Sequence, residues 1–158
     1  MVRLEQLTPQ SQEPPLGSHL VTPRRGYLHH GIYVGDGNVV HYAGLAGGLQ
    51  SGPVEEVPLA RFTRGRPLWI NTHASSQFEC REVIQRARSR MGEDRYHLLT
   101  NNCEHFCEWC LRGEPRSYQV EALLTRLGVL FTTVRYIAQR LPVLGRAGPL
   151  PTRAVTNA

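Results

Sequence analysis

The amino-acid sequence predicts an α+β domain in which antiparallel strands and hairpins pack against a helix that begins with a cysteine. Two β-prone runs within Tyr27–Tyr42 flank Gly35-Asp36-Gly37, and because Asp-Gly is a strong turn signal, this stretch predicts a β-hairpin. Asn102–Leu111 is predicted to be a helix, closed by Gly113. Apolar residues make up 41% of the 158-residue chain, which is enough for one domain with its own core.

Composition divides the chain into four parts. Residues 1–16 are rich in Gln and Pro and are expected to form a flexible N-terminal arm. Proline and glycine are sparse from Asn71 to Leu111, which places the compact domain centrally, over residues 17–116. A helix is expected over residues 117–142, and the Pro, Gly and Arg content of residues 143–158 predicts a flexible tail.

The remaining elements of the central domain are short. Ser76 and Glu79 fit a capping box that opens a helix running to about Met91. The other expected elements are an edge strand at His19–Val21, a mobile loop at Ala43–Gly52, strands at Val54–Val57 and Pro67–Asn71, a helical turn at Leu59–Thr63 and an extended stretch at Tyr96–Thr100.

The helix expected at Val120–Leu141 carries an apolar stripe with a spacing of three and four residues. Its longest uncharged run is far shorter than the ~20 apolar residues that a membrane span requires. Two interpretations stay open. The stripe packs on the domain core or on a second copy of the chain in a homodimer, which is the usual role of such a helix, or it lies on an anionic membrane surface with Arg126, Arg135 and Arg140.

All 18 cationic residues are arginine, and the formal net charge is +5. The absence of lysine excludes Schiff-base chemistry and the lysine of phosphate-binding loops. A basic surface suits anionic partners, but no basic patch interleaved with aromatic residues is present, so nucleic acid is not expected. The segment Met1–Gln10 lacks the apolar core of a secretion signal, so we expect a cytoplasmic protein with reduced thiols, in peripheral contact with membrane if the second interpretation of the helix holds.

Cys103 is the candidate nucleophile. It begins a predicted helix, where the macrodipole and unpaired N–H groups favour a thiolate and are expected to lower its pKa. The N–H groups at Asn102 and Cys103 are placed to serve as an oxyanion hole. Cys107 and Cys110 share the helix face of Cys103, but no fourth ligand is evident, so we interpret them as core residues and expect no metal and no cofactor.

Three other polar side chains of this helix are given simpler roles. The direction of His105 from the helix indicates a structural or surface role. Glu104 and Glu108 are expected to complement the helix dipole and to face solvent.

Three histidines of the hairpin are candidates for a general base and its orienting partner. Strand alternation places His29 and His30 on opposite faces. A two-residue loop would put His41 on the side of His30, whereas a three-residue loop would put it on the side of His29. The residues alone leave both registers open.

The chain resembles the lecithin:retinol acyltransferase family over roughly Gly17–Gly113. The resemblance is carried by His29 with Ile32-Tyr33-Val34-Gly35, by His41 twelve positions after His29, and by Asn102-Cys103-Glu104-His105-Phe106. It implies a circularly permuted papain-like fold, with Cys103 as nucleophile, His29 as general base and His41 as the group that orients His29. It also implies cleavage of an acyl ester of a lipid, an acyl thioester, and transfer of the acyl group to an alcohol, an amine or water.

Two other functions are considered beside this one. Within the same fold, the site could belong to an amidase or peptidase. From another class, the chain could be a non-catalytic, membrane-associated binding module. The presence of Cys103, His29 and His41 together argues against the binding module.

Overall fold

A six-stranded antiparallel sheet is the centre of the fold in the computed structural model, which describes residues 4–7, 13–44, 52–72 and 76–140. The strand order is β1-β6-β2-β3-β4-β5. The strands are β1 (Leu4–Leu7), β2 (His19–Arg24), β3 (Tyr27–Gly35), β4 (Asn38–Gly44), β5 (Gly52–Pro58) and β6 (Leu68–Asn71). The helices are α1 (Leu59–Thr63), α2 (Cys80–Ser89), α3 (Cys103–Arg112) and α4 (Tyr118–Arg140). This arrangement confirms the α+β class.

The β3–β4 hairpin adopts the register that faces His41 toward His29. The turn has two residues, Asp36 and Gly37, and both have positive φ, of 52° and 69°. Gly35 pairs with Asn38, but a bulge then shifts the register, so that Ile32 pairs with Val40. The hairpin therefore has a two-residue turn, but the bulge gives it the register that we expected from a three-residue loop, with His41 on the side of His29.

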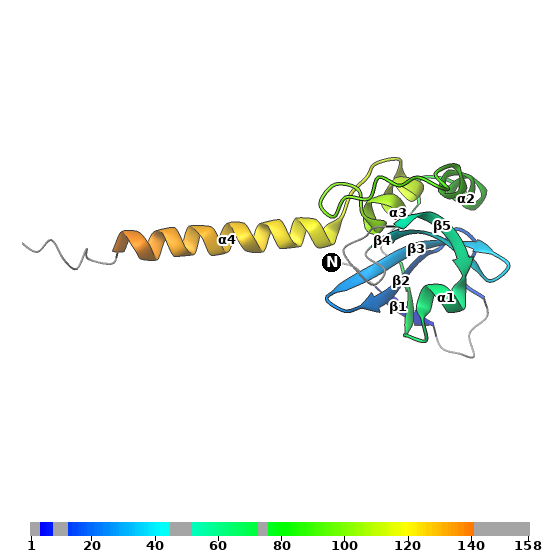
Figure 1. The fold of residues 1–158 in the computed structure, drawn as a ribbon, viewed down its shortest axis with the longest axis horizontal. Helices are drawn as coiled ribbons and strands as arrows, with labels where there is room; N and C mark the ends of the chain where they lie inside the picture. The colour runs from blue at the N-terminus through cyan, green and yellow to red at the C-terminus, as the bar shows by residue number, and fades with distance from the viewer. Residues whose placement is uncertain (1–3, 8–12, 45–51, 73–75, 141–158) are drawn as a thin grey trace, which may run out of the picture. The chain divides into compact units, whose positions relative to one another are not determined.

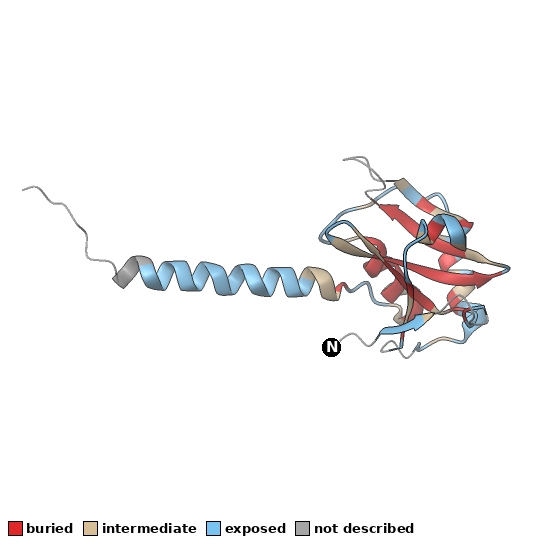
Figure 2. Cartoon of the chain, turned by 90° about the horizontal axis from the view of Figure 1, so that it is seen from below, coloured by how far each residue is buried: buried red, intermediate tan, exposed pale blue. Residues whose placement is uncertain are grey.

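The two faces of the sheet bury separate apolar clusters. On one face, Ile32, Val40 and Tyr42 pack with residues of α2 and α3. On the other face, Tyr33 and Val39 pack with Phe62 of α1. Figure 1 shows α2 and α3 on the opposite side of the sheet from α1, and Figure 2 shows that the central strands and α3 are buried. Strand alternation thus sends neighbouring side chains of β3 to different surroundings.

The helix that carries the candidate nucleophile begins and ends as the sequence predicts. Asn102 is its N-cap and Gly113, at φ 81°, is its C-cap. In contrast, α2 begins at Cys80, because Glu79 is its N-cap and no side chain caps it. Ser76 instead closes a local turn with Phe78, so the predicted capping box is wrong.

Three other expectations need correction. β2 lies between β6 and β3, so it is an interior strand and not an edge strand. Leu4–Leu7, within the expected flexible arm, pairs with β6 as the edge strand of the sheet. Tyr96–Thr100 forms a turn closed by a bridge between His97 and Asn101 and is not extended. Most of the predicted Ala43–Gly52 loop and all of the predicted 143–158 tail lie outside the described residues.

The chain divides into two units, Met1–Glu121 and Ala122–Ala158, and the sheet and α1–α3 belong to the first. The described part of the second unit is the remainder of α4, which forms over the span that the apolar stripe predicted. No helix among the described residues is long and apolar enough to cross a membrane.

Candidate active site

The Cys103 thiol lies at the start of α3, against the middle of β3. Cys103 is buried, with a relative exposure of 3%. Its sulfur accepts a hydrogen bond from the backbone N–H of His30. That N–H is available because the pairing of β3 with β4 extends only to Ile32. The thiol therefore sits at the peptide bond that joins His29 to His30.

Burial raises the pKa of Cys103 to about 12, even though backbone N–H groups of His30, Cys103 and Glu104 lower it. The helix start acts in the expected direction, but desolvation is larger. The expected net lowering is thus wrong for the free protein, in which the thiol is neutral at neutral pH. A base must remove its proton as the sulfur attacks.

His29 and His41 are in contact beside Phe62 of α1, at the point where the β3–β4 pairing ends and the Cys103 sulfur reaches the His29–His30 peptide. Nε2 of His29 lies 3.0 Å from Nδ1 of His41, and Nε2 of His41 lies 3.5 Å from a carboxylate oxygen of Glu55. If His41 donates to Glu55, its Nδ1 must accept from His29, which leaves Nδ1 of His29 without a hydrogen. This Nδ1 is buried and has no hydrogen-bond partner among the described residues. The arrangement gives His29 one free nitrogen that can accept a proton.

The surroundings keep both imidazoles neutral. Burial lowers the pKa of His29 well below its usual value, and the positive charge of a protonated His41 and of Arg24 lowers it further. Burial likewise lowers the pKa of His41 to about 4. The Phe62 ring packs against both imidazoles, at centroid distances of 5.3 and 5.4 Å. Phe62 thus provides the apolar contact that holds the pair in place.

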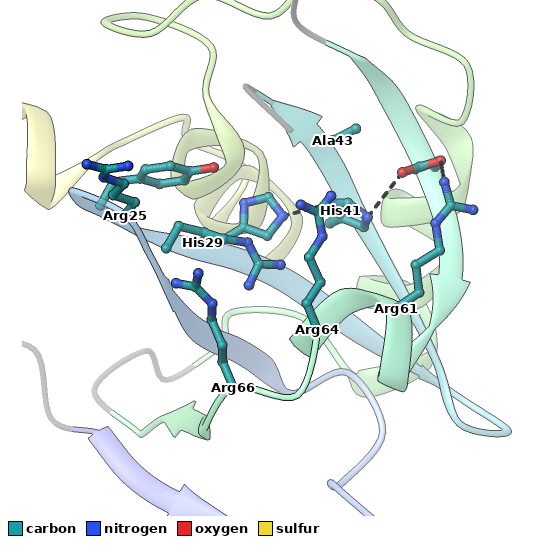
Figure 3. A pocket seen from close by; sticks show the side chains of 10 residues that line it. Arg25, His29, His41, Ala43, Arg61, Arg64 and Arg66 are labelled. Carbon is teal, nitrogen blue, oxygen red and sulfur yellow. Dashed lines mark hydrogen bonds and ion pairs between the residues drawn. The ribbon is translucent and has the colours of Figure 1, made fainter. Parts of the chain in front are cut away.

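A basic pocket opens beside this histidine pair (Figure 3). We call it the arginine pocket, because five arginines line it: Arg24, Arg25, Arg61, Arg64 and Arg66. The other lining residues are Tyr27, His29, His41, Ala43 and Glu55. The side chains of Arg64 and Arg66 point toward the imidazoles in the close view. The pocket therefore brings strong positive charge to the side of the base.

His30, itself buried, belongs to a different polar network. Its Nδ1 lies 2.8 Å from Nε2 of His19, and its Nε2 lies 2.9 Å from the side-chain nitrogen of Gln119. Gln119 also donates to a carboxylate oxygen of Glu104, which accepts the Ser117 hydroxyl as well. With both ring nitrogens engaged, His30 has no nitrogen left for the thiol. Its side chain is structural, and only its backbone N–H reaches Cys103.

Two acidic residues of α3 do not face solvent as expected. Glu104 and Glu108 are 2% and 1% exposed. Glu104 is satisfied by the network of His30, whereas Glu108 forms an ion pair with Arg112 at 3.3 Å and lies 3.7 Å from Nδ1 of His19. Glu104 thus has hydrogen-bond partners from the segment after the helix, and Glu108 has an ion pair one turn along α3; burial of a charge requires such partners.

Asn102 fixes the start of α3. Its side-chain oxygen accepts the N–H groups of Glu104 and His105 at 2.9 and 3.1 Å, and its own N–H donates to Nδ1 of His105 at 3.4 Å. This reciprocal capping box explains the buried His105, whose structural role is confirmed. Since the Asn102 N–H is occupied, the Cys103 N–H is the donor that lies beside the sulfur.

The other cysteines of α3 are core residues, as the sequence predicts. Cys107 and Cys110 are completely buried in the apolar cluster between the sheet and α2. Burial raises the pKa of both thiols, so neither is activated. Within the described ranges, no group of three or more His, Cys, Asp or Glu side chains could hold a metal ion.

Sequence reasoning missed two functional neighbours of the histidines. Glu55 pairs directly with His41 across β4 and β5, and the alternation in Val54-Glu55-Glu56-Val57 is the signal that could have indicated it. Gln119 comes from the first turn of α4, some ninety residues from His30, and no local pattern indicates that contact.

Comparison with known proteins gives consistent matches over this region. The family model described as lecithin retinol acyltransferase matches residues 12–116. Phospholipase A and acyltransferase 2 of Homo sapiens is 32% identical over 73% of this chain and 82% of the relative. Lecithin retinol acyltransferase of Bos taurus is 28% identical over 77% of this chain and 64% of the relative. The family-model match spans the β3–β4 hairpin and the start of α3.

Proposed function

Because this chain belongs to the lecithin retinol acyltransferase family, we propose that it is a thiol acyltransferase and phospholipase that acts on acyl esters of lipids. The relatives' names, phospholipase A and acyltransferase, support transfer and hydrolysis of acyl groups. The observation that carries the proposal is the buried Nδ1 of His29, which has no hydrogen-bond partner in the described part of the chain and lies next to the peptide that binds the Cys103 sulfur. A thiol held at the His29–His30 peptide and an acceptor nitrogen on the same His29 supply the nucleophile and the base that cysteine catalysis uses.

In the first half-reaction, Nδ1 of His29 takes the proton of Cys103 while the sulfur attacks the ester carbonyl. The negative charge that develops on the carbonyl oxygen is met by the backbone N–H of Cys103. The carbon–oxygen ester bond then breaks, and His29 returns its proton to the departing alcohol oxygen. The acyl group remains on Cys103 as a thioester.

In the second half-reaction, an alcohol, an amine or water gives its proton to His29 and attacks the thioester. The thiolate leaves and recovers the proton from His29. In both halves the imidazolium of His29 is stabilised by His41, whose other nitrogen faces the Glu55 carboxylate at 3.5 Å. Glu55 therefore acts on the reaction through His41.

We also propose that α4 brings the enzyme to an anionic lipid surface as a peripheral protein of the cytoplasm. Large apolar side chains of α4 are exposed, among them Leu127, Leu130 and Phe131, and Arg126 and Arg135 lie on the same helix. Sedimentation with anionic vesicles should retain the wild type and release a Leu127→Asp, Phe131→Asp variant. If that variant changes only from dimer to monomer, the helix is instead a dimer interface.

The activity is tested by intact-mass measurement after incubation with a diacyl phospholipid. We expect one fatty-acyl adduct on the wild type and none on Cys103→Ala. The Cys107→Ala variant is the matched control, because its thiol is on the same helix but in the core. Cleavage of a peptide substrate without any lipid adduct would show a peptidase and refute the proposal.

A further inference from the structure

We propose that the arginine pocket binds the phosphate group of a glycerophospholipid substrate, and that the bound negative charge prepares His29 to take the thiol proton. This inference rests on the proposed function, since it concerns the same site. It goes further in assigning the phosphate a binding place and a part in the reaction.

The first argument is unbalanced charge. Of the five arginines that line the pocket, Arg61 lies 3.5 Å from a carboxylate oxygen of Glu55. The other four make no ion pair with a carboxylate among the residues that the structure describes. Arg24 donates to the backbone carbonyls of Phe62 and Thr63, and these bonds hold its guanidinium at the pocket without neutralising it.

The second argument is that the free protein holds these cations together at a cost. Burial lowers the pKa of Arg24, and the charges of Arg64 and Arg66 lower it further. Arg64 is also kept at φ 53°, as the C-cap of α1, a conformation that is uncommon for a residue other than glycine. An anion bound among the guanidinium groups would relieve the repulsion, and the planar donors of arginine match phosphate oxygens.

The third argument is position. Arg24 ends β2, only two residues beyond Thr22, which pairs with His29. Arg64 and Arg66 follow α1 and point toward the imidazoles (Figure 3). In a glycerophospholipid, only a few covalent bonds separate the phosphorus from the nearest ester carbonyl. A phosphate in the arginine pocket would therefore leave an ester carbonyl close to the catalytic pair.

The charge of the phosphate has a consequence for the base. Arg24 and Arg64 are among the groups that lower the pKa of His29 and of His41. A bound anion offsets these cations, so the pKa of His29 rises toward its usual value and the imidazole becomes a stronger base. A neutral ester cannot produce this change. The acid limb of the kcat profile, which reports the enzyme–substrate complex, should lie at higher pH with phospholipid than with a neutral ester.

The test compares two substrates that carry the same acyl chains, phosphatidylglycerol and diacylglycerol, each at low mole fraction in micelles of one neutral detergent. The quantity is the ratio of kcat/KM for phospholipid to kcat/KM for diacylglycerol. In the double variant Arg64→Gln, Arg66→Gln, we expect this ratio to fall at least about tenfold. The charge-conserving variant Arg64→Lys, Arg66→Lys should recover part of it. Arg81→Gln, which removes an exposed cation of α2 outside the pocket, should leave it unchanged.

A second measurement identifies the source of the phosphate. The deacylated headgroup, glycerophosphoglycerol, should inhibit phospholipid cleavage competitively in the wild type and weakly in the double glutamine variant. If inorganic phosphate inhibits and the deacylated headgroup does not, the pocket binds free phosphate and the inference is wrong.

Two further outcomes separate this inference from the proposed function. If the ratio is the same in the wild type and in the double glutamine variant while both form the acyl adduct, the phosphate site is refuted and the activity stands. If neither ester acylates the wild type, the proposed function itself is refuted.

Discussion

Acidification from pH 7 to pH 5 should destabilise this protein through its buried histidines. Burial lowers the pKa of His30 to about 3 and that of His41 to about 4. An unfolded chain has a histidine pKa near 6.5. Because the folded values are depressed, the full stability is present above about pH 6.5 and is lost as the pH falls toward the folded values.

The structure sets the size of this loss. At pH 5 the unfolded histidine binds a proton and the folded one does not, so each of His30 and His41 lowers the free energy of unfolding by about 2 kcal/mol relative to pH 7. Together they contribute about 4 kcal/mol, a large share of the roughly 5–15 kcal/mol that a domain has. The pKa of Glu108 is raised by burial, and this carboxyl acts in the opposite direction.

Urea unfolding followed by circular dichroism at pH 5, 6 and 7 measures the effect. His30→Phe isolates one histidine, and its free energy of unfolding should fall about 2 kcal/mol less than that of the wild type over the same interval. Equal pH dependence in the two proteins would show that His30 is protonated in the folded state. That result would refute the assignment of His30 to a neutral buried network.

Three substitutions test other parts of the structure. Glu55→Gln removes the charge that faces His41, and we expect acylation of Cys103 to slow about fivefold, the effect of roughly 1 kcal/mol for a partly exposed charge; an unchanged single-turnover rate would remove Glu55 from the site. Asn102→Ala deletes both cap bonds of α3 and should lower the free energy of unfolding by about 0.5–2 kcal/mol, whereas an unchanged urea midpoint would contradict this role. Gly31→Ala places a Cβ 2.6 Å from Val39 and 2.9 Å from Phe62, so the free energy of unfolding should fall by about 1–3 kcal/mol. Acylation should also slow, because the Phe62 ring that supports His29 must move. A fully active and equally stable variant would show that Phe62 has room to shift.

Local patterns were sufficient to predict the elements that position the site. The Asp36-Gly37 turn and the helix that Gly113 closes each depend on neighbours within a few positions. The spacing in the family resemblance selected His29 and His41 as partners, which stays a prediction; Nε2 of His29 lies 3.0 Å from Nδ1 of His41. What the residues alone left open was the hairpin register, because the bulge after Tyr33 has no local signal in the sequence.

Burial and long-range partners were the features that sequence reasoning could not supply. The position of Cys103 at a helix start predicts a lower pKa, but its 3% exposure gives the opposite sign. Glu104 reads as a solvent-facing residue of the first helical turn until Ser117 and Gln119 are seen to satisfy its carboxylate. The arginines of the pocket come from the end of β2 and the turn after it, and from α1 and the segment after α1, which lie some forty residues apart in the sequence.

The central claim is that His29, and not His30, takes the proton of Cys103. The most direct measurement is the single-turnover rate of acyl-adduct formation on Cys103 in His29→Gln and in His30→Phe. We predict a loss of at least about 100-fold in His29→Gln, the usual contribution of a general base, and a loss of less than about tenfold in His30→Phe. A large loss in His30→Phe together with a retained rate in His29→Gln would contradict the account.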